Sequence, residues 1–116
     1  MISKIIPQLP SLDLARTEDF YTRKLGFTLK RRYDGFLILM KDDLELHFWH
    51  CHEPLIPQNS SVYCHVDNID ELYGECERQG IVHPNAHLED KPWGIKEFYA
   101  VDPDGNLIKF GQVAFR

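Results

Sequence analysis

The chain of 116 residues is long enough for one hydrophobic core and too short for two independent ones. Hydrophobic residues make up 43% of the sequence and charged residues 27%, a balance that is typical of a globular protein and excludes a disordered chain. The formal net charge of −5 argues against a nucleic-acid-binding protein, which would present a basic face, and suits a cationic small ligand better.

The sequence carries no sign of export or of membrane insertion. No apolar run approaches the roughly 20 residues that a membrane span needs. Pro7 interrupts the apolar start before it reaches the length of a secretory signal. The three cysteines, Cys51, Cys64 and Cys76, form no Cys-x-x-Cys pair and favour reduced thiols over a disulfide framework. We therefore expect a cytoplasmic protein.

The first half of the chain predicts one strand, one helix and three further strands. A strand is expected over Ile2–Gln8, and a helix from about Asp13 to Leu25. Asp13 is suited to the N-cap, and Gly26 stands where a left-handed residue would end the helix. The following strands are predicted over Thr28–Arg32, Phe36–Met40 and Leu44–Trp49, with turns at Asp34-Gly35 and Asp42-Asp43.

The second half repeats this order. A strand over Ser61–Val66 precedes a helix from about Asn68 to Gln79, in which Asn68 and Glu71 have the spacing of a capping box. Gly80 is expected to end this helix. Strands are predicted over Val82–Leu88, Glu97–Val101 and Leu107–Gln112, the last two joined by a turn at Asp102-Pro103-Asp104-Gly105-Asn106.

An internal repeat of two βαβββ modules follows from this order, in a single α+β domain over residues 1–116. Phe36 and Phe48 are 12 residues apart, as are Phe98 and Phe110, so the ends of the two halves correspond in spacing. Module one is expected at about 1–52 and module two at about 61–116. Residues 53–60, which are rich in proline and polar side chains, are expected to link them.

The parity of one predicted strand separates two sheet faces. In Leu44–Trp49 the even-numbered residues are all apolar and are expected to pack against the helices. Glu45, His47 and Trp49 then share the opposite face, where they line either a ligand groove or an ordinary solvent-exposed surface. By the same parity His65 lies beside Ser61 and Tyr63, and a groove-lining and a structural role remain equally open for it.

Short motifs along nearly the whole chain resemble the vicinal oxygen chelate superfamily, which contains glyoxalases, bleomycin resistance proteins and dioxygenases. The motifs are Leu9-Pro10-Ser11-Leu12-Asp13, Phe20-Tyr21, Leu25-Gly26-Phe27, Asp67-Asn68-Ile69-Asp70-Glu71-Leu72-Tyr73 and Asp102-Pro103-Asp104-Gly105-Asn106. The segment Lys91-Pro92-Trp93-Gly94 is similar to the bleomycin-binding resistance proteins in particular. The resemblance implies two curved, antiparallel-rich sheets.

The superfamily's enzymes hold a divalent metal ion with one side chain from the first and one from the last strand of each module. Position by position, the resemblance puts those ligands at Ile6, Glu45, Ser61 and Lys109, of which only Glu45 is suited to a metal ion. We therefore expect no metal, no cofactor and no catalytic residues. A metal-dependent enzyme of the glyoxalase, fosfomycin-modifying or dioxygenase type is the alternative.

The segment from His47 to His52 is a second candidate for metal binding, because it contains three histidines and a cysteine. His47 projects to the face opposite His50 if the strand continues, so the three imidazoles are not expected to converge. His50, Cys51 and His52 lie at a strand end and in the linker. We interpret them as partly exposed polar residues rather than as a metal site.

The resemblance also implies a homodimer whose chains exchange N-terminal arms and form two grooves at their interface. Pro7 and Pro10 would stiffen the exchanged arm. The expected ligand is a cationic, planar aromatic molecule of the bleomycin type, and an unrelated small molecule is the alternative. The residues predicted to bind it are Trp93, Trp49, Phe36, Tyr63, Glu45, His47 and Asp34. Trp93 is favoured because it is a loop residue, although it could instead fold onto the core.

Overall fold

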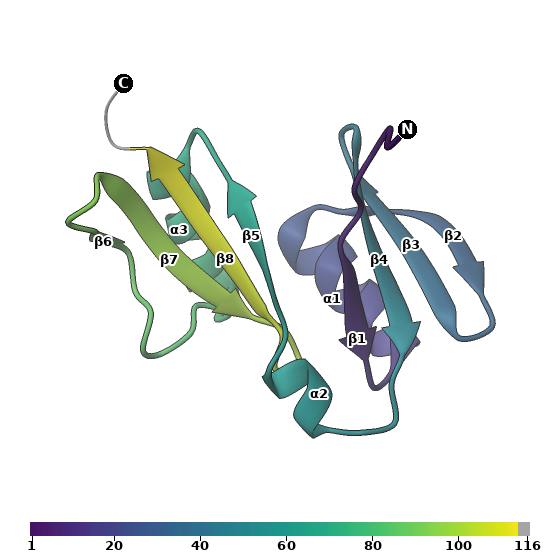
Figure 1. The fold of residues 1–116 in the computed structure, drawn as a ribbon. Helices are drawn as coiled ribbons and strands as arrows, with labels where there is room; N and C mark the ends of the chain where they lie inside the picture. Colours follow the sequence, from purple (N-terminus) through teal and green to yellow (C-terminus); the bar gives the residue numbers. More distant parts are fainter. Residues whose placement is uncertain (114–116) are drawn as a thin grey trace.

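The computed structural model describes residues 1–113 and has the predicted order of two βαβββ modules (Figure 1). Module one consists of β1 (Gln8–Ser11), α1 (Leu14–Leu25), β2 (Thr28–Tyr33), β3 (Phe36–Lys41) and β4 (Leu44–His50). Module two consists of β5 (Ser61–His65), α3 (Ile69–Gln79), β6 (Glu89–Asp90), β7 (Ile95–Val101) and β8 (Leu107–Val113). Residues 114–116, which the prediction assigned to module two, lie outside the described residues.

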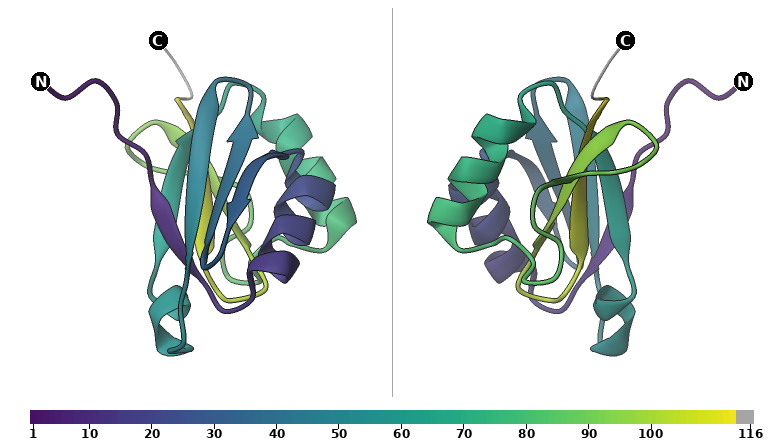
Figure 2. Two further views of the ribbon diagram at one scale, coloured as in Figure 1. Left: turned by 90° about the vertical axis from the view of Figure 1, so that its right-hand side faces the viewer. Right: turned by 90° about the vertical axis from the view of Figure 1, so that its left-hand side faces the viewer.

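Each module forms its own four-stranded sheet. The strand orders are β1-β4-β3-β2 and β5-β8-β7-β6, and in each sheet the first pair is parallel and the others are antiparallel. The two sheets stand side by side with β1 and β5 at their inner edges (Figure 1). Both long helices lie on the same side of the two sheets (Figure 2). No helix of residues 1–113 covers the opposite side of either sheet, and we call this side the open face.

The helix-covered side holds one cluster of buried residues drawn from both modules. Tyr21 of α1 packs on Phe48 of β4 with 4.8 Å between ring centroids, and Phe98 of β7 packs on Phe110 of β8 at 5.1 Å. Tyr21, Phe48 and Phe98 are each at most 1% exposed. Removal of apolar side chains such as these from water is the main driving force for folding. Over residues 1–113, none of the helices combines the length and the apolar character needed to cross a membrane.

The predicted helix ends are confirmed except for one cap. Asp13 accepts a hydrogen bond from the Arg16 backbone N–H at 3.1 Å, and Gly26 and Gly80 end α1 and α3 with φ of 75° and 70°. The predicted capping box is wrong, because the side chain of Asn68 caps no N–H. Instead Gln112 of β8 accepts from the Ile69 N–H at 2.9 Å. A residue from another strand thus fills a position that local spacing assigned to the helix itself.

Two predicted strands differ from the observed ones. The strand expected over Ile2–Gln8 is wrong, since β1 starts at Gln8, and Pro7, which has no N–H, stands where the arm leaves the sheet. The strand expected over Val82–Leu88 is also wrong. Val82 makes one isolated bridge to Ala100, Pro84 follows, and β6 is limited to two residues. The predicted linker contains a short helix, α2 (Leu55–Gln58).

The repeat and the strand parity hold only in part. Leu46 and Phe48 face the core as expected, but Leu44 is 70% exposed because it lies at the first position of β4, beyond the cover of α1. The spacing of 12 between phenylalanines does not mark equivalent pairs. Phe98 is buried opposite Phe110, whereas Phe36 lies on the open face and Leu37 stands opposite Phe48. The turn between β7 and β8 is longer than the turn between β3 and β4, so the partner of Phe48 is Leu37, one residue after Phe36.

Candidate functional site

The open face of module one gathers most of the residues that the strand parity predicted. Glu45, His47 and Trp49 alternate along β4 with the buried Leu46 and Phe48. Phe36 of β3 stands opposite Trp49 in register, and its ring contacts His47 edge-on with 5.3 Å between centroids. Trp49 is 36% exposed, so an aromatic surface is available to a partner molecule on this face.

The carboxylate of Glu45 is already neutralised within the chain. It lies 2.8 Å from His47 Nε2, 3.1 Å from Lys4 Nζ and 3.3 Å from Lys30 Nζ. The hydrogen bond with His47, then that with Lys4, lowers the pKa of Glu45 to about 2. Its place on the open face is as predicted, but it has little charge to offer a ligand. Across residues 1–113, His47 Nδ1 is one of two buried side-chain polar atoms with no hydrogen-bond partner.

The open face of module two has a different polar centre. The hydroxyl of Tyr63 in β5 donates to Glu97 Oε2 in β7 at 2.5 Å. The phenol crosses β8 directly above Gly111, where a Cβ would lie 1.9 Å from the hydroxyl oxygen. Removal from water and the bond to Glu97 raise the pKa of Tyr63 to about 12, so the phenol stays protonated and donates. Tyr63 is one of the residues predicted from the sequence to bind a ligand, whereas Glu97 is not.

Lys109 and His65 complete this face. Lys109 Nζ lies 5.2 Å above the centroid of the Tyr99 ring, a cation–π contact on β7. Lys109 stands opposite Tyr63 in register, while Ser61 stands opposite Leu107. His65 is exposed, with its ring 5.3 Å from that of Tyr63. The positions that the resemblance assigned to a metal in module two therefore hold a hydroxyl and an ammonium group, neither of which suits a divalent cation.

Trp93 and Asp34 lie on connections at the outer ends of the molecule. Trp93 is 64% exposed in the loop between β6 and β7, which a hydrogen bond from Gly94 N–H to Lys91 O closes at 3.1 Å. The alternative in which this tryptophan folds onto the core is therefore wrong. Asp34 is exposed in the turn between β2 and β3. These two connections are far apart in Figure 1, so one chain does not bring all the predicted residues together.

Two open clefts lie near the outer edges of the two sheets. The first, of about 340 Å³, lies between residues 84–91 and β7, and we call it the outer cleft of module two. Its polar and aromatic lining includes His87, Glu89, Lys91, Glu97 and Tyr99. The second, of about 380 Å³, lies between α1 and the β2–β3 hairpin. It includes Phe36 and Tyr33 beside the ion pair of Arg32 with Glu18.

The histidine-rich segment does not form a metal cage. The rings of His50 and His52 approach to 4.4 Å between centroids, while Cys51 is buried and its thiol contacts the Glu53 carbonyl at 3.3 Å. His47 lies on the open face with Glu45. In the part of the chain that the structure describes, no three His, Cys, Asp or Glu side chains are grouped to hold a metal ion.

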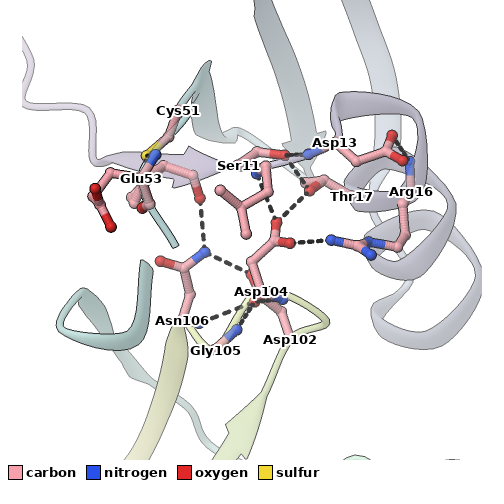
Figure 3. A network of polar contacts seen from close by, with 12 residues as sticks. Ser11, Asp13, Arg16, Thr17, Cys51, Glu53, Asp102, Asp104, Gly105 and Asn106 are labelled. Carbon is pink, nitrogen blue, oxygen red and sulfur yellow. Dashed lines mark hydrogen bonds and ion pairs between the residues drawn. The ribbon is translucent and has the colours of Figure 1, made fainter. Parts of the chain in front are cut away.

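A buried polar network joins the two modules, and Figure 3 shows how the turn between β7 and β8 inserts its side chains beside β1 and α1. Asp102 accepts from the Tyr21 hydroxyl and from the Asn106 side-chain amide, both at 2.8 Å. The same amide also donates to the Pro10 carbonyl at 2.9 Å. Burial raises the pKa of Asp102, although the hydrogen bonds it accepts act in the opposite direction.

The rest of this network centres on Asp104, whose side chain is fully buried. Its carboxylate pairs with Arg16 and accepts from the Leu12 backbone N–H at 3.1 Å and from the Thr17 hydroxyl at 3.4 Å. The sequence predicted only a hairpin turn here. The sequence signal for a buried polar network is the number of hydrogen-bond acceptor side chains in this segment, which is larger than a hairpin turn needs. The network has a structural role, because its polar groups bind one another, with the exception of Asn106 Oδ1, which has no hydrogen-bond partner within residues 1–113.

Comparison with known proteins agrees with this architecture. The model of the glyoxalase/bleomycin resistance protein/dioxygenase superfamily matches residues 7–110. A bleomycin resistance protein of Geobacillus stearothermophilus is 37% identical, with 92% of this chain and 94% of that protein covered. One from Klebsiella pneumoniae is 36% identical, with 97% and 94% covered.

Two solved structures share the fold over nearly their whole length. A bleomycin resistance determinant encoded on the transposon Tn5 has a TM-score of 0.84 and 31% identity, with 98% of this chain and 100% of that one covered. A bleomycin-binding protein complexed with bleomycin has a TM-score of 0.79 and 32% identity, with 96% and 98% covered. The chain belongs to the glyoxalase/bleomycin resistance protein/dioxygenase superfamily.

Proposed function

We propose that the protein binds a bleomycin-type antibiotic and confers resistance by sequestering it, without chemical turnover. The observation that carries the proposal is the similarity, over 96% of the chain, to a bleomycin-binding protein whose structure contains bleomycin. A ligand of this class has a planar aromatic part and a positively charged tail. Tight binding alone is sufficient for sequestration, so the site has to supply contact area and charge but no reactive group.

The exposed aromatic side chains support this proposal. Trp93 is 64% exposed, Tyr63 41% and Trp49 36%, whereas large aromatic residues without a partner are normally buried. Phe36 and His47 extend the aromatic surface beside Trp49, and these rings offer faces on which a planar cation can stack. Asp34 would add negative charge at the tip of the β2–β3 hairpin.

We infer that binding needs no metal ion and that the protein is not an enzyme. The chemistry of the four mapped positions supports this inference. Ile6 has no donor atom, Ser61 offers a neutral hydroxyl, and the ammonium of Lys109 would repel a divalent cation. Glu45, the one suitable ligand, is held by Lys4 and Lys30 instead.

The proposed assembly is a homodimer in the cytoplasm, with residues 1–7 of each chain lying on the partner. Met1, Ile2 and Ile5 support this, because they are at least 83% exposed on an arm outside the sheet. A dimer would also let the Trp93 loop of one chain approach the open face of the other. Light scattering should give about twice 13.6 kDa at micromolar concentration, and a stable monomer would contradict it. The free state of all three cysteines supports the cytoplasmic location.

Calorimetric titration of the purified protein with metal-free and with copper-loaded bleomycin tests the function. We expect saturable binding of about one ligand per chain, with the ligand recovered unchanged. Absence of binding would point to another ligand. Elemental analysis that finds one tightly held divalent ion per chain, lost in a Glu45→Ala variant, would instead establish the metal-dependent enzyme.

A further inference from the structure

The carboxylate of Glu97 is unusual among the acidic groups of the open faces. The residue is only 7% exposed, so its carboxylate is largely removed from water, and it is one of the residues that line the outer cleft of module two. One oxygen accepts the Tyr63 hydroxyl at 2.5 Å. Within residues 1–113 this carboxylate has no cation at ion-pairing distance, in contrast to Glu45 with its two lysines and a histidine.

The nearby cations are engaged elsewhere. Lys109, which also lies on the open face, has its ammonium above the ring of Tyr99. Lys91, at the rim of the outer cleft, pairs with Glu89, and the charge of Glu97 acts on it only as a smaller contribution that raises its pKa. A partly buried charge without a counter-ion is costly, and it attracts any cation that can reach it more strongly than an exposed charge does. The carboxylate of Glu97 can therefore form an ion pair with a cationic group of another molecule.

The surrounding groups hold Glu97 in one orientation. Tyr63 reaches it only because Gly111 leaves room, and an added Cβ there would lie 2.7 Å from the phenol Cζ. A donor fixed in this way orients the carboxylate and satisfies one of its lone pairs without neutralising its charge. The β6–β7 loop that carries Trp93 adjoins the same cleft through Lys91. The loop that carries Trp93 and the carboxylate of Glu97 thus lie at the same edge of the sheet of module two.

We propose that Glu97, oriented by the hydroxyl of Tyr63, is the counter-ion for the cationic group of the ligand, and that the outer cleft of module two is where this group binds. The proposal rests on the proposed function and refines it. It assigns recognition of the ligand's charge to Glu97 in the sheet of module two instead of Glu45 in the sheet of module one. It assigns Tyr63 a positioning role rather than a stacking role.

Calorimetry at low and at high salt tests this with bleomycin and with a derivative whose cationic tail is replaced by a carboxylate. Glu97→Gln keeps the shape and the acceptor for Tyr63, and it should weaken bleomycin binding about tenfold or more at low salt, and less at high salt. It should also remove most of the preference for bleomycin over the derivative. Glu75→Gln, which removes an exposed carboxylate from α3, is the matched control. It should change neither the affinity for bleomycin nor the preference for bleomycin over the derivative.

Tyr63→Phe is the second variant. It retains the charge, so it should keep the preference for the cationic ligand while lowering affinity several-fold through loss of the fixed orientation. If the wild type binds no bleomycin, the proposed function itself fails. If the wild type binds and Glu97→Gln matches it in affinity, salt dependence and ligand preference, this inference alone fails. A lower melting temperature with unchanged binding would show that the Tyr63–Glu97 contact serves only stability.

Discussion

The two modules carry similar side chains on similar sheets but keep them in different states. Each open face has one partly buried carboxylate. In module one three cationic or potentially cationic groups surround Glu45, whereas in module two the phenol of Tyr63 is the only side chain among residues 1–113 that forms a hydrogen bond or ion pair with Glu97. The same residue type is thus an internal ion-pair partner on one sheet and an open anion on the other. The difference shows that charge on a sheet face indicates binding only when its partners are known.

The two modules also differ in how far their tryptophans and their hairpin turns are exposed. Trp49 lies on a strand and is 36% exposed, while Trp93 lies on a loop and is 64% exposed. The β3–β4 turn at Asp42-Asp43 is short and exposed, but the β7–β8 turn is buried against module one. Module two therefore supplies both the buried turn that joins the modules and, among residues 1–113, the most exposed tryptophan.

The largest effect is expected at the β7–β8 turn. Asp102→Ala removes the acceptor of the fully buried Tyr21 hydroxyl and of one N–H of the Asn106 amide, whose other bond, to the Pro10 carbonyl, remains. Loss of such a network costs about 3 kcal/mol or more, which corresponds to a decrease of roughly 10 °C in the melting temperature of a domain of this size. Urea and thermal unfolding measure both quantities.

Asp43→Ala is the corresponding change in module one. Asp43 is exposed in the β3–β4 turn, so its removal should alter stability by no more than about 0.5 kcal/mol. Equal losses in the two variants would contradict the distinction between a joining turn and a simple hairpin turn.

Features that depend on neighbours in sequence were predicted well. The Asp13 cap, the glycine ends of both helices, and the alternation of Leu46 and Phe48 with Glu45 and His47 all follow from local spacing. The strand expected over Ile2–Gln8 was wrong because the apolar residues of this segment do not specify a strand that would pair with it, and Ile2 and Ile5 remain exposed.

Features that depend on distant partners were missed. The neutralisation of Glu45 involves Lys4, 41 residues away, and the contact of Tyr63 with Glu97 spans 34 residues. The bond from Asn106 to Pro10 spans 96. Such pairs are set by sheet order and register, which strand periodicity alone does not specify. The sequence therefore predicted the sheet face on which Glu45 lies, but not that this carboxylate is paired within the chain.

An intermediate effect is expected from the tryptophans. Trp93→Ala should weaken bleomycin binding by about 2 kcal/mol, or roughly thirtyfold, and leave the melting temperature nearly unchanged, because the side chain is mostly exposed. Trp49→Ala should lower stability as well, by about 1–2 kcal/mol, since part of its ring is buried opposite Phe36. Affinity and melting temperature measured on both variants separate the two roles. A large decrease in melting temperature for Trp93→Ala with unchanged binding would exclude it from the site.

The smallest effect concerns the pH dependence of Glu45. Its pKa in the folded protein is about 2, below the ordinary 4.5, because the bond with His47, then those with Lys4 and Lys30, favour the ionised form. A carboxyl with a lowered pKa stabilises the folded state above its ordinary pKa, and this contribution is lost as the pH falls from about 4.5 towards 2. Melting temperatures of the wild type and of Glu45→Gln should therefore differ most near neutral pH and converge towards pH 2. Added salt should reduce the difference, because the lysines are half exposed. A difference that stays constant across this pH range would mean that the ion pairs of Glu45 do not hold in solution, and that its charge is as available to a ligand as that of Glu97.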